Sequence, residues 1–128
     1  MKLVITFKQT IMRFITKKMH AFLDYPVAIS LILLPFLLGL GSTNPIALYL
    51  SIATGFAALS LTLLTDHQLG LFRVISYKIH LIIDFIVAIV FILAPFIFSF
   101  QGVDAYYYWI IGVTVFFVVS LQKSEVAI

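Results

Sequence analysis

Two histidine–aspartate pairs are the side chains of this sequence that could bind a metal ion, bind a haem or transfer protons. His20 is followed four residues later by Asp24, and His80 is followed four residues later by Asp84. Residues four apart share one face of a helix, so each aspartate can hydrogen-bond its own histidine and orient the imidazole. Two imidazoles and two carboxylates could bind Zn²⁺ or iron, and two opposed imidazoles could ligate a haem. Ionisable groups in a membrane segment could also carry protons.

The same pairs also have a structural interpretation that needs no cofactor. Both lie in the first turns of predicted helices, where the helix dipole favours an aspartate. A rise of about 1.5 Å per residue places Asp24 only about 9 Å beyond Lys18, within reach of headgroups or water. The pairs could then simply fix the helix ends and their register. His67 follows the second predicted helix, and it either extends this polar site or is a solvated loop residue.

The two pairs belong to an internal repeat with an offset of 60 residues. The segment from Lys18 to Asp24 returns from Lys78 to Asp84. The match continues through Val27/Val87, Ala28/Ala88, Ile29/Ile89, Ile32/Ile92, Leu33/Leu93, Pro35/Pro95 and Phe36/Phe96. The second halves of the units align at an offset of 57, through Tyr49/Tyr106 and Gly55/Gly112. Because His, Asp and Pro recur in register, chance similarity between apolar segments is a poor explanation.

Both pairs lie in segments that the composition identifies as membrane-spanning helices. Hydrophobic residues make up 63% of the chain and charged residues 10%, whereas soluble domains have about 45–50% and about 25%. Four segments are long and apolar enough to cross a hydrocarbon layer of about 30 Å. We predict spans at residues 19–40, 46–64, 79–100 and 105–121.

These spans predict an all-α, polytopic membrane protein built from two parallel helical-hairpin repeats. Two helices per unit preserve orientation, so the repeats should be related by a pseudo-two-fold axis along the membrane normal. Gly55 and Gly112 are predicted to allow close helix packing, while Pro35 and Pro95 are tolerated in membrane helices and predicted to kink or unwind them locally. The expected organisation is an amphipathic interfacial helix (1–18), hairpin repeat 1 (19–66), a cytoplasmic loop (67–78), hairpin repeat 2 (79–122) and a C-terminal tail (123–128).

The basic residues predict the orientation of the chain. With four spans, all eight fall on one side: Lys2, Lys8, Arg13, Lys17, Lys18, Arg73, Lys78 and Lys123. Cytoplasmic loops collect Lys and Arg, so we expect a multi-pass protein of the bacterial inner membrane with both termini cytoplasmic. Its expected partners are membrane lipids rather than nucleic acid, because the basic residues are few and border the membrane. The aromatic run at residues 106–109 is predicted to lie in the opposite membrane interface.

One feature of both hairpins resembles a known family. Asp24, Ala28 and Leu34-Pro35-Phe36 form a pattern that returns as Asp84, Ala88 and Ala94-Pro95-Phe96. This pattern is similar to that of the SPW-repeat family of prokaryotic membrane proteins, although neither Ser nor Trp stands beside either proline. The resemblance covers about residues 20–121 and implies a bacterial inner-membrane protein with tandem hairpins. It implies no biochemical activity.

Two classes of function follow. The leading hypothesis is a small structural or accessory inner-membrane protein, either a homo-oligomer or a subunit of a larger membrane assembly. The alternative is a membrane protein that handles a metal ion, haem or protons through His20, Asp24, His80 and Asp84. Enzymatic activity is not indicated, because the sequence has no Gly-rich phosphate loop, serine nucleophile arrangement or His-Glu-x-x-His motif.

Overall fold

Four α-helices make up the protein over residues 13–122, the part of the chain that the computed structural model describes. Their bounds are Lys17–Leu37 (α2), Ile46–Leu64 (α3), Tyr77–Ile97 (α4) and Val103–Ser120 (α5). Each is long and apolar enough to cross a membrane. The prediction of an all-α protein with four membrane-spanning helices is confirmed.

The predicted interfacial helix over residues 1–18 falls mostly outside the described residues, as does the tail at 123–128. Residues 13–16 are described and are not helical. Ile15 instead pairs its backbone with the end of the chain, where its N–H donates to the carbonyl of Leu121 at 3.0 Å. Any interfacial helix must therefore end before Arg13.

The first and third helices each start two residues earlier than predicted, because a hydroxyl residue caps each one. Thr16 accepts a hydrogen bond from the N–H of Met19, and Ser76 accepts one from Ile79. Such caps satisfy backbone donors that have no partner inside the helix. Both helices end two residues after their proline, at Leu37 and Ile97. Pro35 and Pro95 are buried there.

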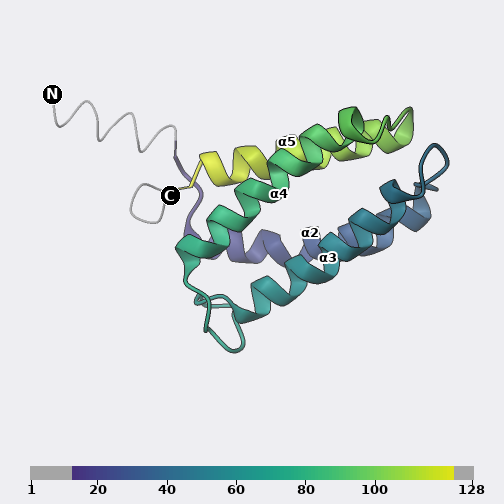
Figure 1. Cartoon of the computed structure of the whole chain (residues 1–128). Helices are drawn as coiled ribbons and strands as arrows, with labels where there is room; N and C mark the ends of the chain where they lie inside the picture. Colours follow the sequence, from purple (N-terminus) through teal and green to yellow (C-terminus); the bar gives the residue numbers. More distant parts are fainter. Residues whose placement is uncertain (1–12, 123–128) are drawn as a thin grey trace, which may run out of the picture.

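The helices pack in sequential pairs, α2 along α3 and α4 along α5, so the fold consists of two hairpins (Figure 1). A glycine lies at each contact. A Cβ at Gly55 would lie 2.6 Å from Cγ1 of Ile32 and 3.0 Å from the carbonyl oxygen of Ala28. A Cβ at Gly112 would lie 2.9 Å from Cγ1 of Ile92. The backbones approach this closely only because both residues lack a side chain.

The two hairpins exchange equivalent contacts, as two-fold symmetry requires. Ile15 forms a backbone bridge with Gln122, and Ile75 forms one with Thr65. Ile15 and Ile75 are 60 residues apart, and Thr65 and Gln122 are 57 apart, which are the two offsets of the sequence repeat. Each hairpin thus places the start of its first helix against the end of the other hairpin's second helix. This reciprocal pattern is typical of an interface between units related by a two-fold axis.

The end that carries the two short turns, which we call the turn end, is held by a buried carboxylate and an aromatic core. Asp104 accepts hydrogen bonds from the N–H of Gly41 at 3.0 Å and from the N–H and hydroxyl of Thr43. Tyr108 donates to the carbonyl of Ala47 at 2.7 Å. Tyr107 and Tyr108 are buried in this core, whereas Tyr106 is 64% exposed, so only part of the aromatic run predicted for the membrane interface faces outward.

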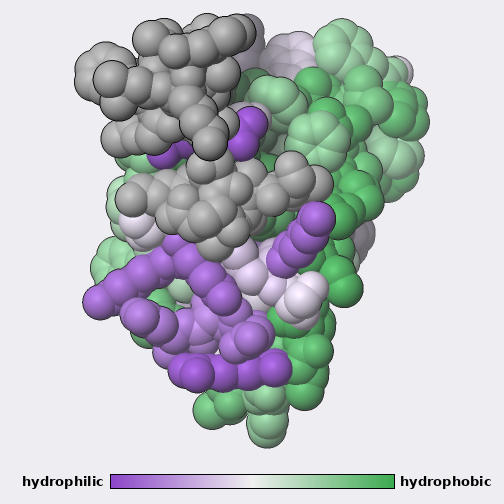
Figure 2. All heavy atoms as spheres, turned by 90° about the vertical axis from the view of Figure 1, so that its left-hand side faces the viewer, coloured by the Kyte–Doolittle hydropathy of each residue, from purple (hydrophilic) through white to green (hydrophobic). Residues whose placement is uncertain are grey.

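The opposite end, which we call the loop end, contains residues 65–76 and the starts of α2 and α4. Figure 2 views the bundle from this side, and hydrophilic residues gather on part of that face while hydrophobic residues flank it. Along the helices, large apolar side chains are exposed, including Phe22, Phe36 and Leu37. Such exposure suits a protein whose flanks face lipid.

Candidate metal centre

Four ionisable side chains meet at the loop end, on the contact between α2 and α4. Nε2 of His20 lies 3.1 Å from Asp24 and 2.9 Å from Asp84. Nε2 of His80 lies 3.2 Å from Asp24 and 3.1 Å from Asp84. Each histidine therefore contacts its own aspartate, as the spacing predicts, and also the aspartate of the other repeat. One ligand atom from each residue lies within 4.8 Å of every other, so the group could hold a metal ion.

The other ring nitrogen of His80 is held by a threonine at the end of α3. Thr65 Oγ1 lies 2.7 Å from Nδ1 of His80, and it donates its own proton to the carbonyl of Leu61 at 2.6 Å. A hydroxyl has a single proton, so toward His80 it acts as an acceptor. The proton of this contact must belong to Nδ1 of His80.

Gln122 holds His20 in the same way from the end of α5. Its Oε1 lies 2.9 Å from Nδ1 of His20 and accepts from the hydroxyl of Tyr77 at 3.0 Å. Its amide nitrogen donates to the carbonyl of Ile15 at 2.9 Å, which assigns Oε1 as the acceptor. Nδ1 of His20 therefore also carries a proton.

Because Nδ1 of both histidines is protonated, a proton or a metal ion must lie between each Nε2 atom and the carboxylate oxygens. A neutral imidazole with a proton on Nδ1 has a lone pair on Nε2, and a carboxylate offers only acceptor atoms. Lone pairs facing each other at 2.9–3.2 Å repel unless a proton or a metal ion lies between them. Two protons, one on each Nε2, balance the two carboxylates. One divalent metal ion balances them equally well.

The dimensions and surroundings of the group suit a metal ion. Zinc bonds of about 2.0–2.2 Å at tetrahedral angles separate neighbouring ligand atoms by about 3.3 Å. The four nitrogen–oxygen distances of 2.9–3.2 Å are close to this value, and one ligand atom from each residue lies within 4.8 Å of the others. The imidazoles are 1% exposed. Metal-binding histidines usually donate their second N–H to an oxygen, which fixes the ring and its tautomer. Thr65 and Gln122 supply these oxygens.

A haem does not suit the same group. An axial pair of histidines needs free space around both Nε2 atoms for the porphyrin ring. Asp24 and Asp84 occupy that space, since each lies within 3.2 Å of both Nε2 atoms.

His67 lies beside the centre and is buried, not solvated. It is 3% exposed, and its ring centroid lies 6.1 Å from that of His80 and 6.4 Å from that of Tyr77. Neither ring nitrogen has a hydrogen-bond partner among residues 13–122. Burial lowers the pKa of His67 below its usual 6.5, because a charged imidazole loses hydration there. His67 thus extends the polar region without contacting either carboxylate.

The sequence predicts the four central residues but not the ones that orient them. Thr65, Tyr77 and Gln122 are common polar residues near helix ends, and their types alone carry no signal. The sequence repeat does give a signal for Thr65 and Gln122. Thr65 and Gln122 are related by the offset of 57 that aligns Gly55 with Gly112, so each occupies the same place in its repeat.

The fold and the centre define a four-span membrane protein with a partly buried histidine–aspartate group that could hold a metal ion. Comparison with models of protein families, with curated protein sequences and with solved structures gives no match to this chain.

Proposed function

We propose that this protein binds a divalent transition-metal ion of the zinc type through His20, Asp24, His80 and Asp84. The observation that carries the proposal is the convergence of both Nε2 atoms on both carboxylates while oxygens fix both Nδ1 atoms. Imidazole and carboxylate are ligands of Zn²⁺ and related ions, and the four-residue set gives a tetrahedral number of donors.

Charge balance gives the proposed site a defined exchange reaction. In the metal-free form, two imidazolium groups face two carboxylates. In the metal-bound form, two neutral imidazoles and two carboxylates surround one divalent ion. Both forms are electrically neutral, which matters at this depth because an unbalanced charge in a membrane segment costs about 2.5–3.5 kcal/mol on insertion scales. Metal uptake therefore releases up to two protons.

A structural role for the proton-filled form is the second candidate. The group ties α2 to α4, and close helix packing elsewhere lies within each hairpin. The protein would then be an accessory membrane protein whose hairpins are held together by imidazolium–carboxylate pairs. This candidate needs no metal, so metal binding separates the two.

The proposed setting is the bacterial inner membrane, with lipids as partners and either self-association or a larger membrane assembly as its context. Membership of an SPW-repeat-like group remains part of this proposal. Reporter fusions test the orientation. A fusion after Gly70 should report from the cytoplasm and one after Ser42 from the periplasm. A cytoplasmic signal from Ser42 contradicts the orientation.

A Co²⁺ titration tests the metal proposal, because this ion replaces zinc and is coloured in tetrahedral sites. The full chain, purified in nanodiscs and treated with a chelator, should bind one equivalent and develop visible absorption that Zn²⁺ removes. His20→Gln and His80→Gln should each abolish the absorption, since the two histidines have equivalent places in the site. Asp66→Asn is the matched control, because Asp66 is exposed in the neighbouring loop.

Two results would overturn the proposal. One is wild-type protein that binds no stoichiometric metal. The other is binding that survives in His20→Gln and His80→Gln. Circular dichroism of each variant shows whether lost binding reflects lost folding, and wild-type stoichiometry tests the proposal even if a variant fails to fold.

A further inference from the structure

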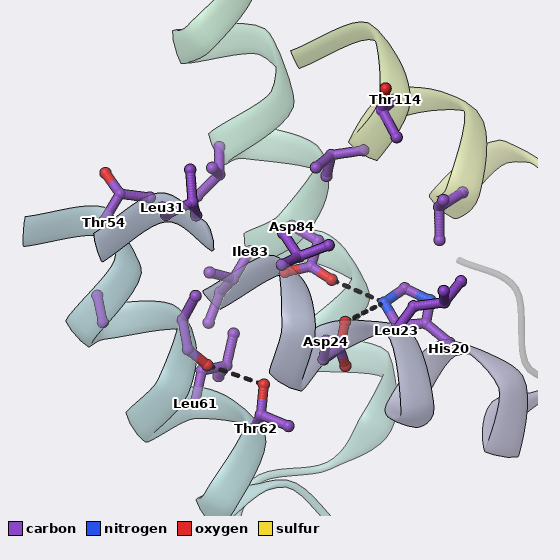
Figure 3. Close-up of a pocket in the computed structure, with 16 residues that line it drawn as sticks. His20, Leu23, Asp24, Leu31, Thr54, Leu61, Thr62, Ile83, Asp84 and Thr114 are labelled. Atoms are coloured by element: carbon purple, nitrogen blue, oxygen red, sulfur yellow. Dashed lines mark hydrogen bonds and ion pairs between the residues drawn. The ribbon is translucent and has the colours of Figure 1, made fainter. Parts of the chain in front are cut away.

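A cavity of about 280 Å³ adjoins the histidine–aspartate group, and all four helices line it. Figure 3 shows Asp24, Asp84 and His20 at one part of its wall. The rest of the lining is mainly aliphatic, and small side chains such as Ala57 and Ala58 on α3 leave the space open. Ala57 and Thr114 are exposed, so the cavity opens toward the lipid-facing surface.

The cavity wall offers acceptors but few donors. The hydroxyls of Thr54, Thr62 and Thr114 donate to carbonyls four residues earlier in their own helices. The carboxylates are the more exposed members of the histidine–aspartate group, at 14% for Asp24 and 17% for Asp84, against 1–2% for the histidines. Both histidines contact Oδ2 of Asp84, and Oδ1 of Asp84 takes part in none of the four histidine–aspartate contacts. A ligand in the cavity therefore meets carboxylate oxygens with spare lone pairs.

Charge balance limits which polar headgroup a ligand in this cavity can carry. The carboxylates are already neutralised, by two protons or by one divalent ion. An ammonium headgroup would add an unbalanced positive charge, and a carboxylate or phosphate would place a negative charge against Asp24 and Asp84. A hydroxyl adds no charge and donates the hydrogen bond that these oxygens can accept.

We propose that this cavity binds a single-chain amphiphile with a hydroxyl headgroup, whose hydroxyl donates to Asp24 or Asp84 and whose chain lies between the hairpins. The volume is near the lower end of small-molecule sites, which span about 300–1,000 Å³, so it suits one hydrocarbon chain. The lateral opening lets the chain pass directly from the bilayer. The proposal holds for both the proton-filled and the metal-filled form, and it does not depend on metal binding.

Four probes of equal chain length test the proposal: 1-dodecanol, dodecane, dodecanoate and dodecylammonium. Each is titrated into the full chain in nanodiscs, and bound probe is counted by native mass spectrometry. The alcohol should saturate at one equivalent, and the other three should bind at least about tenfold more weakly, a difference of about 1.4 kcal/mol. Equal binding of dodecane, or tighter binding of either charged probe, overturns the hydroxyl assignment.

Ala57→Phe tests the location, because the new ring fills the cavity. Ala53→Phe is the matched control, since Ala53 lies one turn earlier on α3, is exposed and does not line the cavity. Only Ala57→Phe should lose dodecanol, and it should keep Co²⁺ binding. Equal loss in both variants, or no saturable binding by the wild type, overturns the proposal. If the wild type binds dodecanol but no metal ion, the metal proposal is contradicted and the amphiphile proposal is not.

Discussion

His20 Nε2 lies 2.9 Å from Oδ2 of Asp84, 64 residues later in the chain. This distance is shorter than the 3.1 Å between His20 and Asp24, the partner on its own helix. His80 in turn contacts Asp24 at 3.2 Å. Each hairpin therefore supplies one histidine and one aspartate to a centre that the two hairpins share.

This relationship predicts energetic coupling between residues of different hairpins. His20→Gln and Asp84→Asn, combined in a double-mutant cycle, should show a coupling of about 0.5–3 kcal/mol in the free energy of unfolding. A cycle between His20 and Asp24 should give a similar value. The measurement is reversible unfolding in mixed micelles. Coupling of His20 to Asp24 alone would show that the hairpins do not share the centre.

Gly55→Ala and Gly112→Ala should each destabilise the protein by about 1–3 kcal/mol, the usual cost of overfilling a packed contact. The added Cβ would lie 2.6 Å from Cγ1 of Ile32 in the first case and 2.9 Å from Cγ1 of Ile92 in the second. Ala53→Leu on the exposed face of α3 is the control and should have little effect. Thermal unfolding in detergent measures all three. Unchanged stability in both glycine variants would contradict the close backbone contact.

Asp104→Asn should loosen the turn end and leave the metal centre intact. The carboxylate accepts three hydrogen bonds from Gly41 and Thr43, and an amide nitrogen in its place would oppose donors with another donor. We expect a loss of about 1–3 kcal/mol in unfolding free energy. Co²⁺ binding should be unchanged, because the two clusters lie at opposite ends of the bundle. Loss of metal binding would show that the ends are coupled.

His67 should make stability depend on pH. Its pKa is lowered by burial in the folded state, so the unfolded chain takes up a proton that the folded protein resists. Stability from this residue is complete above the unfolded pKa of about 6.5 and is lost as pH falls below it. His67→Phe removes this dependence and should unfold at a temperature that changes less between pH 7 and pH 5. If the unfolding temperatures of variant and wild type changed equally with pH, His67 would not be the source of the pH dependence.

The sequence was sufficient to predict the four helices and the central residues, because both depend on strong local patterns. Long apolar runs identify membrane helices, and the spacing of His20 and Asp24 requires them to share a helix face. Capping was a weaker signal. By capping their helices, Thr16 and Ser76 move each helix start two residues earlier than hydropathy alone predicts.

The pairing of the hairpins could not be predicted in the same way. Contacts such as His20 with Gln122 join residues 102 positions apart, and they depend on how two units pack rather than on local spacing. The burial of Tyr107 and Tyr108 was missed for a related reason. Aromatic residues at a helix end suit both a membrane interface and a packed core, and only the position of the other hairpin decides between them.

The number of protons released on metal binding shows whether His20 and His80 exchange their Nε2 protons for a metal ion. Calorimetric titration of Zn²⁺ in buffers with different ionisation enthalpies measures the number of protons released per ion. The centre described here predicts one ion bound and proton release that approaches two as pH is lowered, because each Nε2 must give up a proton before it can coordinate. His80→Gln should abolish both the binding and the release. Wild-type protein that binds no Zn²⁺, or binds it with no proton release at any pH, would contradict a metal site built from these two imidazoles.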